Sequence, residues 1–378
     1  MELLTCSFTP EGGWTKEIPS ALDSERTLVL VFAAPEFRDD DRAIAGLRRV
    51  LPRSHLLGCS TAGEIAGTLV NDRSLSVAIV RFEHSDIEIA AASVSGAADS
   101  FAAGARIGES LPPDGLRAVF VLSDGLNVNG SELVKGLNAS LPTGTVVTGG
   151  MAADGDRFER TWVLHEDRLQ SGVIVAAGLY GDRLRIGHGS RGGWDSFGPE
   201  RRVTRAVGNV LYELDGKPAL ALYKEYLGER AAGLPATGLL FPLSIRLDTE
   251  DAPNLVRTIL AVDESAQSMT FAGDIPQGCM ARLMRANFDR LVNGASIAAD
   301  QAAESLPAGP TLAVAISCVG RRLVLGERIE EETEVALEHL PDGTQQVGFY
   351  SYGEISPYAS GSCDLHNQTM TLTTVMER

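Results

Sequence analysis

The sequence has few basic residues relative to its acidic ones. Lys and Arg together number 33 against 50 Asp and Glu, and the formal net charge at pH 7 is −17. A surface of this sign repels the phosphates of nucleic acids and of anionic lipids, and no basic stripe offsets it. The charge therefore argues against nucleic acids and against membrane surfaces as partners.

Long hydrophobic runs are also missing. The longest apolar stretches, such as 172–180 and 312–316, are far shorter than the roughly 20 residues of a membrane-spanning helix. The N-terminal segment lacks the basic region and the apolar core of a signal peptide. The five cysteines are scattered, with no CxxC pair and no zinc-type spacing to histidine. We expect a cytoplasmic protein with reduced thiols and no metal site.

Familiar catalytic motifs are absent as well. The sequence contains no P-loop, no G-x-G-x-x-G and no G-x-S-x-G. Cys59 follows a predicted strand, but a nucleophilic thiol needs a base, and no local Cys/His signature supplies one. An enzyme that uses Cys59 together with Glu64 stays open as an alternative. From the missing motifs we expect a binding protein and not an enzyme.

What the sequence does contain is a repeated unit. A predicted strand over 28–33 and a helix over 39–50 lead into GCSTAGEI at 58–65. Near the other end, a strand over 312–316 and a later helix lead into GFYSYGEI at 348–355. Both segments fit G-x-x-x-x-G-E-I in the same register, so we expect the two G-E-I tripeptides to occupy equivalent positions.

A third copy of the unit lies between these two, with a short helix expected over 131–138. The segment 200–305 differs from the copies and carries two helix-like stretches, 218–227 and 280–298. The sequence thus predicts a two-lobed α/β protein with mixed sheets, whose lobes join near residue 212. It is built from three pseudo-repeated strand–helix–strand modules, near 27–92, 117–189 and 311–376.

Small and polar residues follow the predicted strands, where α/β proteins usually bind ligands. The turn at 58–64 offers amides, hydroxyls and the carboxylate of Glu64, and the loop at 123–131 offers a helix N-terminus to an anion. Buried packing in the first case and turn or cap chemistry in the second are the structural alternatives. The candidate ligand-binding residues are Cys59, Ser60, Thr61, Gly63, Glu64, Asp124, Asn127, Asn129, Ser131, Gly150, Glu354 and Asn367.

Several motifs taken together resemble the FIST family of sensory proteins: GCSTAGEI at 58–65, GGMA at 149–152, FYSYGEISP at 349–357 and LHNQT at 365–369. The resemblance covers nearly the whole chain. It implies a FIST N-like sensory domain, a FIST C-like domain and a C-terminal strand that packs on the C-terminal lobe, over 28–212, 213–360 and 361–378. It also implies a cytoplasmic small-ligand sensor that acts in signal transduction through a separate partner.

Within that family, GHGSRGGW at 187–194 and GNVLYELD at 208–215 are similar to segments of bacterial nitric-oxide-sensing haem proteins. This resemblance implies haem held by a histidine, a gas ligand, and a histidine kinase or cyclic-di-GMP enzyme as partner. His366 is the first candidate ligand, because its polar neighbours could orient the ring. His188 is the second, because its flanking glycines would admit a flat macrocycle. The alternative is an amino acid or other small polar ligand without haem, held near 127–131 and by Glu64.

Overall fold

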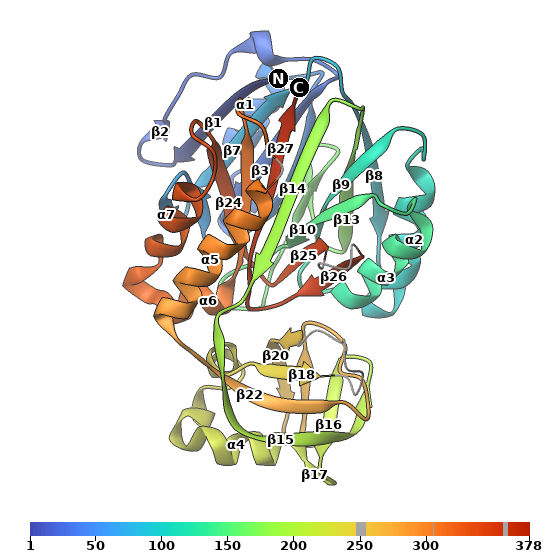
Figure 1. Ribbon diagram of the computed structural model, residues 1–378, viewed down its shortest axis with the longest axis vertical. Helices are drawn as coiled ribbons and strands as arrows, with labels where there is room; N and C mark the ends of the chain where they lie inside the picture. Colours follow the sequence, from blue (N-terminus) through green and yellow to red (C-terminus); the bar gives the residue numbers. More distant parts are fainter. Residues whose placement is uncertain (247–254, 305, 358–361) are drawn as a thin grey trace.

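The computed structural model describes residues 1–246, 255–304, 306–357 and 362–378. Figure 1 shows a main body that carries both termini at its top and a smaller lobe below it. The main body contains three sheets, and the central strand of each sheet is almost wholly buried. Apolar residues run through these strands without alternation, as expected for sheets that are covered on both faces.

The first sheet has the order β12-β11-β4-β3-β7-β1-β2. Its strands are β12 (Arg168–Gln170), β11 (Val163–His165), β4 (His55–Ser60), β3 (Thr27–Ala33), β7 (Leu75–Arg81), β1 (Glu2–Thr9) and β2 (Gly13–Trp14). The second sheet has the order β26-β25-β10-β9-β13-β8. Its strands are β26 (Cys363–His366), β25 (Gly353–Pro357), β10 (Val146–Met151), β9 (Leu116–Ser123), β13 (Val173–Tyr180) and β8 (Asp86–Ser93).

The third sheet has the order β14-β27-β23-β24-β5-β6. Its strands are β14 (Leu184–Arg191), β27 (Met370–Glu377), β23 (Leu312–Cys318), β24 (Gln345–Ser351), β5 (Glu64–Ala66) and β6 (Leu69–Asn71). Helices flank the sheets on the outside of the body (Figure 1). They are α1 (Arg42–Val50), α2 (Ser100–Ser110), α3 (Gly130–Ser140), α5 (Phe288–Ala303), α6 (Val319–Leu325) and α7 (Glu330–Glu338).

The three sheets exchange strands with one another. Each contains a parallel pair, namely β3 with β4, β9 with β10, and β23 with β24. The strand that follows each pair leaves for another sheet: β5 joins β24, β11 joins β4, and β25 joins β10. Both G-E-I tripeptides lie where such an exchanged strand begins. The mixed α/β class agrees with the sequence-based expectation, whereas the superposition of the three modules stays a prediction.

The lobe is an eight-stranded sheet with the order β19-β18-β22-β15-β16-β21-β20, in which β17 pairs with β16. The strands are β15 (Trp194–Val207), β16 (Val210–Leu214), β17 (Lys217–Pro218), β18 (Leu243–Arg246), β19 (Leu255–Arg257), β20 (Ile259–Asp263), β21 (Ser268–Phe271) and β22 (Met280–Ala286), and they pack with α4 (Ala219–Leu227). The expected boundary at residue 212 falls inside β16, and β14 pairs with the C-terminal β27. The division into two family domains stays a prediction.

The expectation of one helix over 280–298 is wrong in its first half, which is a strand. The stretch 280–298 contains strand β22 followed by the start of α5. Asn287 separates the two, because its side chain accepts a hydrogen bond from the Arg290 N–H and caps the helix. Pairing of β22 with both β15 and β18 makes the first half a strand. None of the helices in the described ranges is long and apolar enough to cross a membrane.

Candidate functional site

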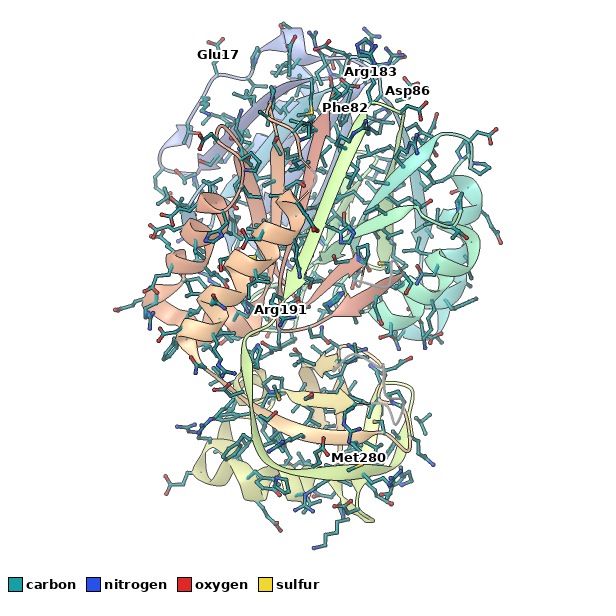
Figure 2. The ribbon with its side chains drawn as sticks, viewed as in Figure 1. Glu17, Phe82, Asp86, Arg183, Arg191 and Met280 are labelled. Atoms are coloured by element: carbon teal, nitrogen blue, oxygen red, sulfur yellow. The ribbon has the colours of Figure 1, made fainter. Side chains whose placement is uncertain are left out.

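A cavity of about 910 Å³ lies between the main body and the lobe. Its longest wall is β14 with the residues that follow it, since every position from Arg185 to Trp194 lines the space. The end of α5 contributes Gln301 and Ala302, and the lobe contributes Arg257. Figure 2 shows Arg191 at the junction of body and lobe. The volume is within the range of small-molecule sites.

The cavity brings together the two histidines that the sequence singles out. His188 lies on β14 and His366 at the end of β26, and both line the space. Burial lowers the pKa of both imidazoles, that of His366 to about 4, so both rings are neutral at pH 7. The Nε2 atom of His366 lies 3.0 Å from the carbonyl oxygen of Ser356. No hydrogen bond to the His188 ring is found among the described residues, and this ring is half-buried.

The glycines on both sides of His188 allow helix α5 to pack closely on β14. A Cβ at Gly187 would lie 1.9 Å from the carbonyl oxygen of Ala302, and a Cβ at Gly189 would lie 2.0 Å from that of Ala298. Both carbonyls belong to α5, which packs directly on β14. The glycines therefore admit the helix on that face of β14, and the approach of a macrocycle to His188 stays a prediction.

Glu64 and Glu354 lie in the protein interior and bind their own chain. The carboxylate of Glu64 accepts hydrogen bonds from Thr61 Oγ1 and from the Ser74 N–H (3.0 Å) and Oγ (2.7 Å). The Glu354 carboxylate accepts from Ser351 Oγ (2.7 Å) and from the Thr369 N–H (3.2 Å) and Oγ1 (2.9 Å). Burial raises their pKa values to about 7 and about 8. This placement fits the alternative of buried acceptors that fix neighbouring loops.

The small residues near Glu64 are likewise away from the cavity. Cys59 is fully buried, and burial raises the pKa of its thiol well above the ordinary value. Ser60 Oγ accepts a hydrogen bond from the Trp162 N–H at 3.1 Å. The guanidinium of Arg322 covers Gly63, and Gly150 packs against Ile316. A protonated, buried thiol argues against a nucleophilic Cys59.

The anion site expected at the N-terminus of α3 is occupied by the chain itself. Asp274 of the lobe accepts hydrogen bonds from Asn129 Nδ2 at 3.0 Å and from Lys135 Nζ at 2.6 Å. The Asp274 N–H donates to Ser131 Oγ at 3.2 Å. Burial alone would raise the pKa of Asp274, but the contacts with Lys135 and Asn129 lower it. Asp274 therefore joins the lobe to the body through hydrogen bonds and an ion pair. The residues around Asp274 in the sequence do not predict this contact.

The other residues of that loop stabilise its turn. The Oδ1 atom of Asp124 accepts hydrogen bonds from the N–H groups of Leu126 and Asn127, both at 2.8 Å. Its Oδ2 accepts from the Gly172 N–H at 2.7 Å. Asn129 caps α3 through the Ser131 and Glu132 N–H groups. Of the candidate residues, only Asn367 joins the two histidines at the cavity.

We expect the variant Asp274→Ala to lower the free energy of unfolding by about 2 kcal/mol, because charge-assisted hydrogen bonds are lost at the interface between lobe and body. A protease should also cleave the segments that connect lobe and body faster in this variant than in the wild-type protein. Urea denaturation and limited proteolysis measure the two effects. Glu229→Ala, which changes an exposed carboxylate of the lobe, is the control. Equal free energies of unfolding and equal proteolysis rates in the two variants would show that Asp274 does not stabilise the contact between lobe and body.

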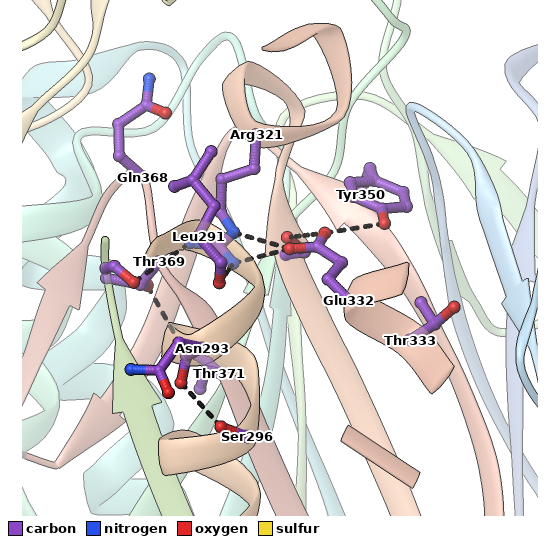
Figure 3. Close-up of polar contacts among 12 residues, drawn as sticks. Leu291, Asn293, Ser296, Arg321, Glu332, Thr333, Tyr350, Gln368, Thr369 and Thr371 are labelled. Atoms are coloured by element: carbon purple, nitrogen blue, oxygen red, sulfur yellow. Dashed lines mark hydrogen bonds and ion pairs between the residues drawn. The ribbon is translucent and has the colours of Figure 1, made fainter. Parts of the chain in front are cut away.

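A buried ion pair contacts the two connections that lead into and out of the lobe. Figure 3 shows its two members, Arg321 and Glu332, beside Leu291. Arg321 and Glu332 are fully buried, and Arg321 Nη2 lies 2.6 Å from Glu332 Oε2. Arg321 also donates to the carbonyl of Leu291 at 2.8 Å and to that of Gly192 at 3.4 Å. Gly192 precedes the first strand of the lobe, and Leu291 follows its last. The sequence analysis missed this pair, because α7 reads as a solvated acidic helix.

The molecule is an α/β protein with a lobe inserted between β14 and α5 and a cavity between lobe and body. The FIST N domain model matches residues 27–217, about half of the chain, and the FIST C domain model matches residues 219–357. The chain belongs to the FIST family, whose domains are sensory domains of signal transduction. Two segments that the sequence analysis quoted for the resemblance, 58–65 and 149–152, lie in the first matched region.

Uncharacterised proteins of Mycobacterium tuberculosis strains CDC 1551 and H37Rv are each 28% identical to this chain over 264 residues. That match covers 67% of this chain and 66%, just under two thirds, of each relative. An uncharacterised protein of Methanocaldococcus jannaschii is 28% identical over 204 residues, 49% of this chain and 37% of the relative.

A crystal structure of cyanuric acid hydrolase from A. caulinodans matches 100% of this chain and 99% of its own, with a TM-score of 0.36 and 9% identity. This finding corrects the expectation that the chain is not an enzyme, since a protein matched along the whole length is a hydrolase. At this TM-score the likeness carries no argument for hydrolase activity either.

Proposed function

We propose that this FIST protein senses a small ligand in the cavity between body and lobe and passes the signal to a separate protein of the cytoplasm. The observation that carries the proposal is that His188 and His366, from distant parts of the chain, line one cavity together with residues of the lobe. A ligand there contacts both parts of the molecule. Such a ligand can shift the lobe relative to the body, which is what a sensor requires.

Haem is the first candidate for this ligand, and the cavity residues fit it. His188 offers a neutral, half-buried imidazole, and Trp194 and Met284 offer apolar contact. Arg185 and Arg191 could pair with the two propionates. Haem, if bound, would supply an iron atom that can take nitric oxide as a ligand. Nε2 of His366 contacts the Ser356 carbonyl, so His366 could reach iron only through its other ring nitrogen, whereas no hydrogen bond of the described residues engages the His188 ring. We therefore take His188 as the first candidate ligand and His366 as the second.

Titration of the purified protein with haemin tests this candidate. We expect a Soret band in the wild-type protein that is lost in His188→Ala, because the variant removes the neutral imidazole. The band should persist in His84→Ala, which changes an exposed histidine outside the cavity. Loss of the band in His366→Ala alone would assign the iron to His366. The absence of a band in the wild-type protein would overturn the haem proposal.

A small polar ligand without haem is the second candidate. Three arginines, Arg185, Arg191 and Arg257, line the cavity, whereas Glu304 is the only carboxylate among its described lining residues. In a chain with a net charge of −17, such a lining favours an anion. The partner on this proposal, as on the haem proposal, is a signalling protein such as a histidine kinase or a cyclic-di-GMP enzyme.

A further inference from the structure

One edge of β14 is open along the cavity. The strand pairs with β27 without a bulge, from Leu184 opposite Glu377 to Arg191 opposite Met370. No strand of the described residues pairs with its other edge, where β14 ends the third sheet. Consecutive residues of β14 line the cavity. Since successive side chains point to opposite faces of a strand, the cavity borders the strand along its edge. The cavity therefore runs along the backbone of an edge strand.

The hydrogen bonds around β14 show which backbone groups face the cavity. The Ser190 N–H donates to the side chain of Gln301 at 3.3 Å, so this N–H points away from β27. In an antiparallel pair, alternate residues direct their N–H and C=O groups to the same side. Ile186 and His188 consequently present theirs to the open edge. Among the described residues, no hydrogen bond to these backbone groups is found outside the pairing with β27.

Both ends of this open stretch are covered by side chains. The Arg185 guanidinium donates to the carbonyl of Leu184 at 2.8 Å, and Gln301 covers the Ser190 N–H as described above. Unpaired edges invite the addition of a strand, and proteins usually protect them in this manner. The backbone of Ile186 and His188 is left uncovered between two protected ends. The open stretch accommodates a short strand only.

A second, independent observation points to a polar ligand. Asn367 lines the cavity and is 1% exposed, and its Oδ1 atom has no hydrogen-bond partner in the described part of the chain. Its Nδ2 atom donates to the carbonyl of Tyr352 at 3.4 Å. A buried acceptor without a partner is costly. If the Asn367 side chain turned toward the cavity, an N–H or O–H donor on a ligand would satisfy this atom.

We propose that the ligand of this cavity is a short acidic peptide, bound in an extended conformation as an additional strand on β14. This inference rests on the second candidate of the proposed function, a small polar ligand without haem, and names the chemical class of that ligand. The peptide backbone pairs with the N–H and C=O groups of Ile186 and His188, as in other cases of strand addition. Its carboxylates meet the guanidinium groups at the two ends of the open stretch, Arg185 and Arg191, which both line the cavity.

Fluorescence anisotropy with a defined probe tests the inference. The probe is a labelled, capped pentapeptide of alternating glutamate and valine. Two matched peptides accompany it: one with N-methyl groups on alternate residues, which removes backbone donors, and one with lysine in place of glutamate. We expect the first peptide to bind, the N-methylated peptide to bind at least tenfold more weakly, and the lysine peptide not to bind.

Variants of the protein complete the test. Arg191→Glu should weaken binding of the glutamate peptide about tenfold, whereas Arg168→Glu, which changes an exposed arginine on edge strand β12, should leave it unchanged. Equal binding of the methylated and unmethylated peptides would overturn strand addition. If no peptide binds while haemin or a free amino acid does and His188→Ala abolishes that binding, this inference fails and the proposed function stands. If none of these probes binds, both fail.

Discussion

Glu332→Gln is expected to lower the free energy of unfolding by about 3 kcal/mol or more, because it leaves the Arg321 guanidinium buried without a counter-charge. Both side chains are fully buried, and Glu332 Oε1 also accepts hydrogen bonds from Tyr350 Oη at 2.8 Å and Ser317 Oγ at 2.9 Å. Urea denaturation measures the loss. Since Arg321 also holds the carbonyls of Leu291 and Gly192, proteolysis at the connections to the lobe should accelerate in the same variant.

Glu331→Gln is the matched control for this prediction. Its carboxylate is the next one along the chain and pairs with Arg328 at 2.7 Å, but both side chains are more than 40% exposed. A solvent-exposed pair of this kind contributes little to stability, because water and salt screen it. The double variant Arg321→Met with Glu332→Leu should recover much of the loss, because it removes both buried charges together. Equal losses in Glu332→Gln and Glu331→Gln would refute the importance of the buried pair.

Glu354→Gln is expected to gain stability relative to the wild-type protein as the pH rises from 5 to 9. Burial raises the pKa of Glu354 from 4.5 to about 8. Between these values the folded state binds more protons than the unfolded state, so the stability of the wild-type protein falls with rising pH. The variant cannot ionise and escapes this loss. The difference should amount to several kcal/mol, because each unit of pKa corresponds to about 1.4 kcal/mol.

Denaturant unfolding at a series of pH values measures this difference. Glu64→Gln should behave in the same direction with a smaller amplitude, because burial raises the pKa of Glu64 to about 7. Glu17→Gln, which changes an exposed carboxylate, should show a constant difference from the wild-type protein. A Glu354→Gln curve parallel to the wild-type curve would mean that the buried carboxyl titrates normally.

Parts of the fold could be predicted from local sequence. The buried strands and the helices α1 and α3 are found near the expected residues, because an unbroken apolar run or a capped polar segment is a local signal. The strand of 280–286 was not found, because nothing local distinguishes it from the helix that follows Asn287. The exchange of β5, β11 and β25 between sheets could not be predicted either, since it depends on pairing between remote segments.

The candidate site shows the same division. His188, His366 and Asn367 were each proposed from their neighbours in the sequence, and all three line the cavity. The polar residues at 58–64 and 123–131 were proposed on equal grounds, but their hydrogen bonds end on Ser74, Trp162, Gly172 and Asp274. Residue type thus shows which side chains can form hydrogen bonds or ion pairs. It does not show whether the binding partner is a ligand or another part of the chain.

The sequence by itself determined the α/β class, the acidic surface and membership of a sensory family, because composition, apolar runs and contiguous motifs are properties of neighbouring residues. Only the tertiary structure decided that Asp274 accepts hydrogen bonds from Asn129 and Lys135, that Arg321 contacts both connections of the lobe, and that β14 presents an open edge to a cavity. Each of these contacts joins residues far apart in the chain. Burial, charge pairing and hydrogen bonding at those places depend on three-dimensional proximity, which no local pattern contains.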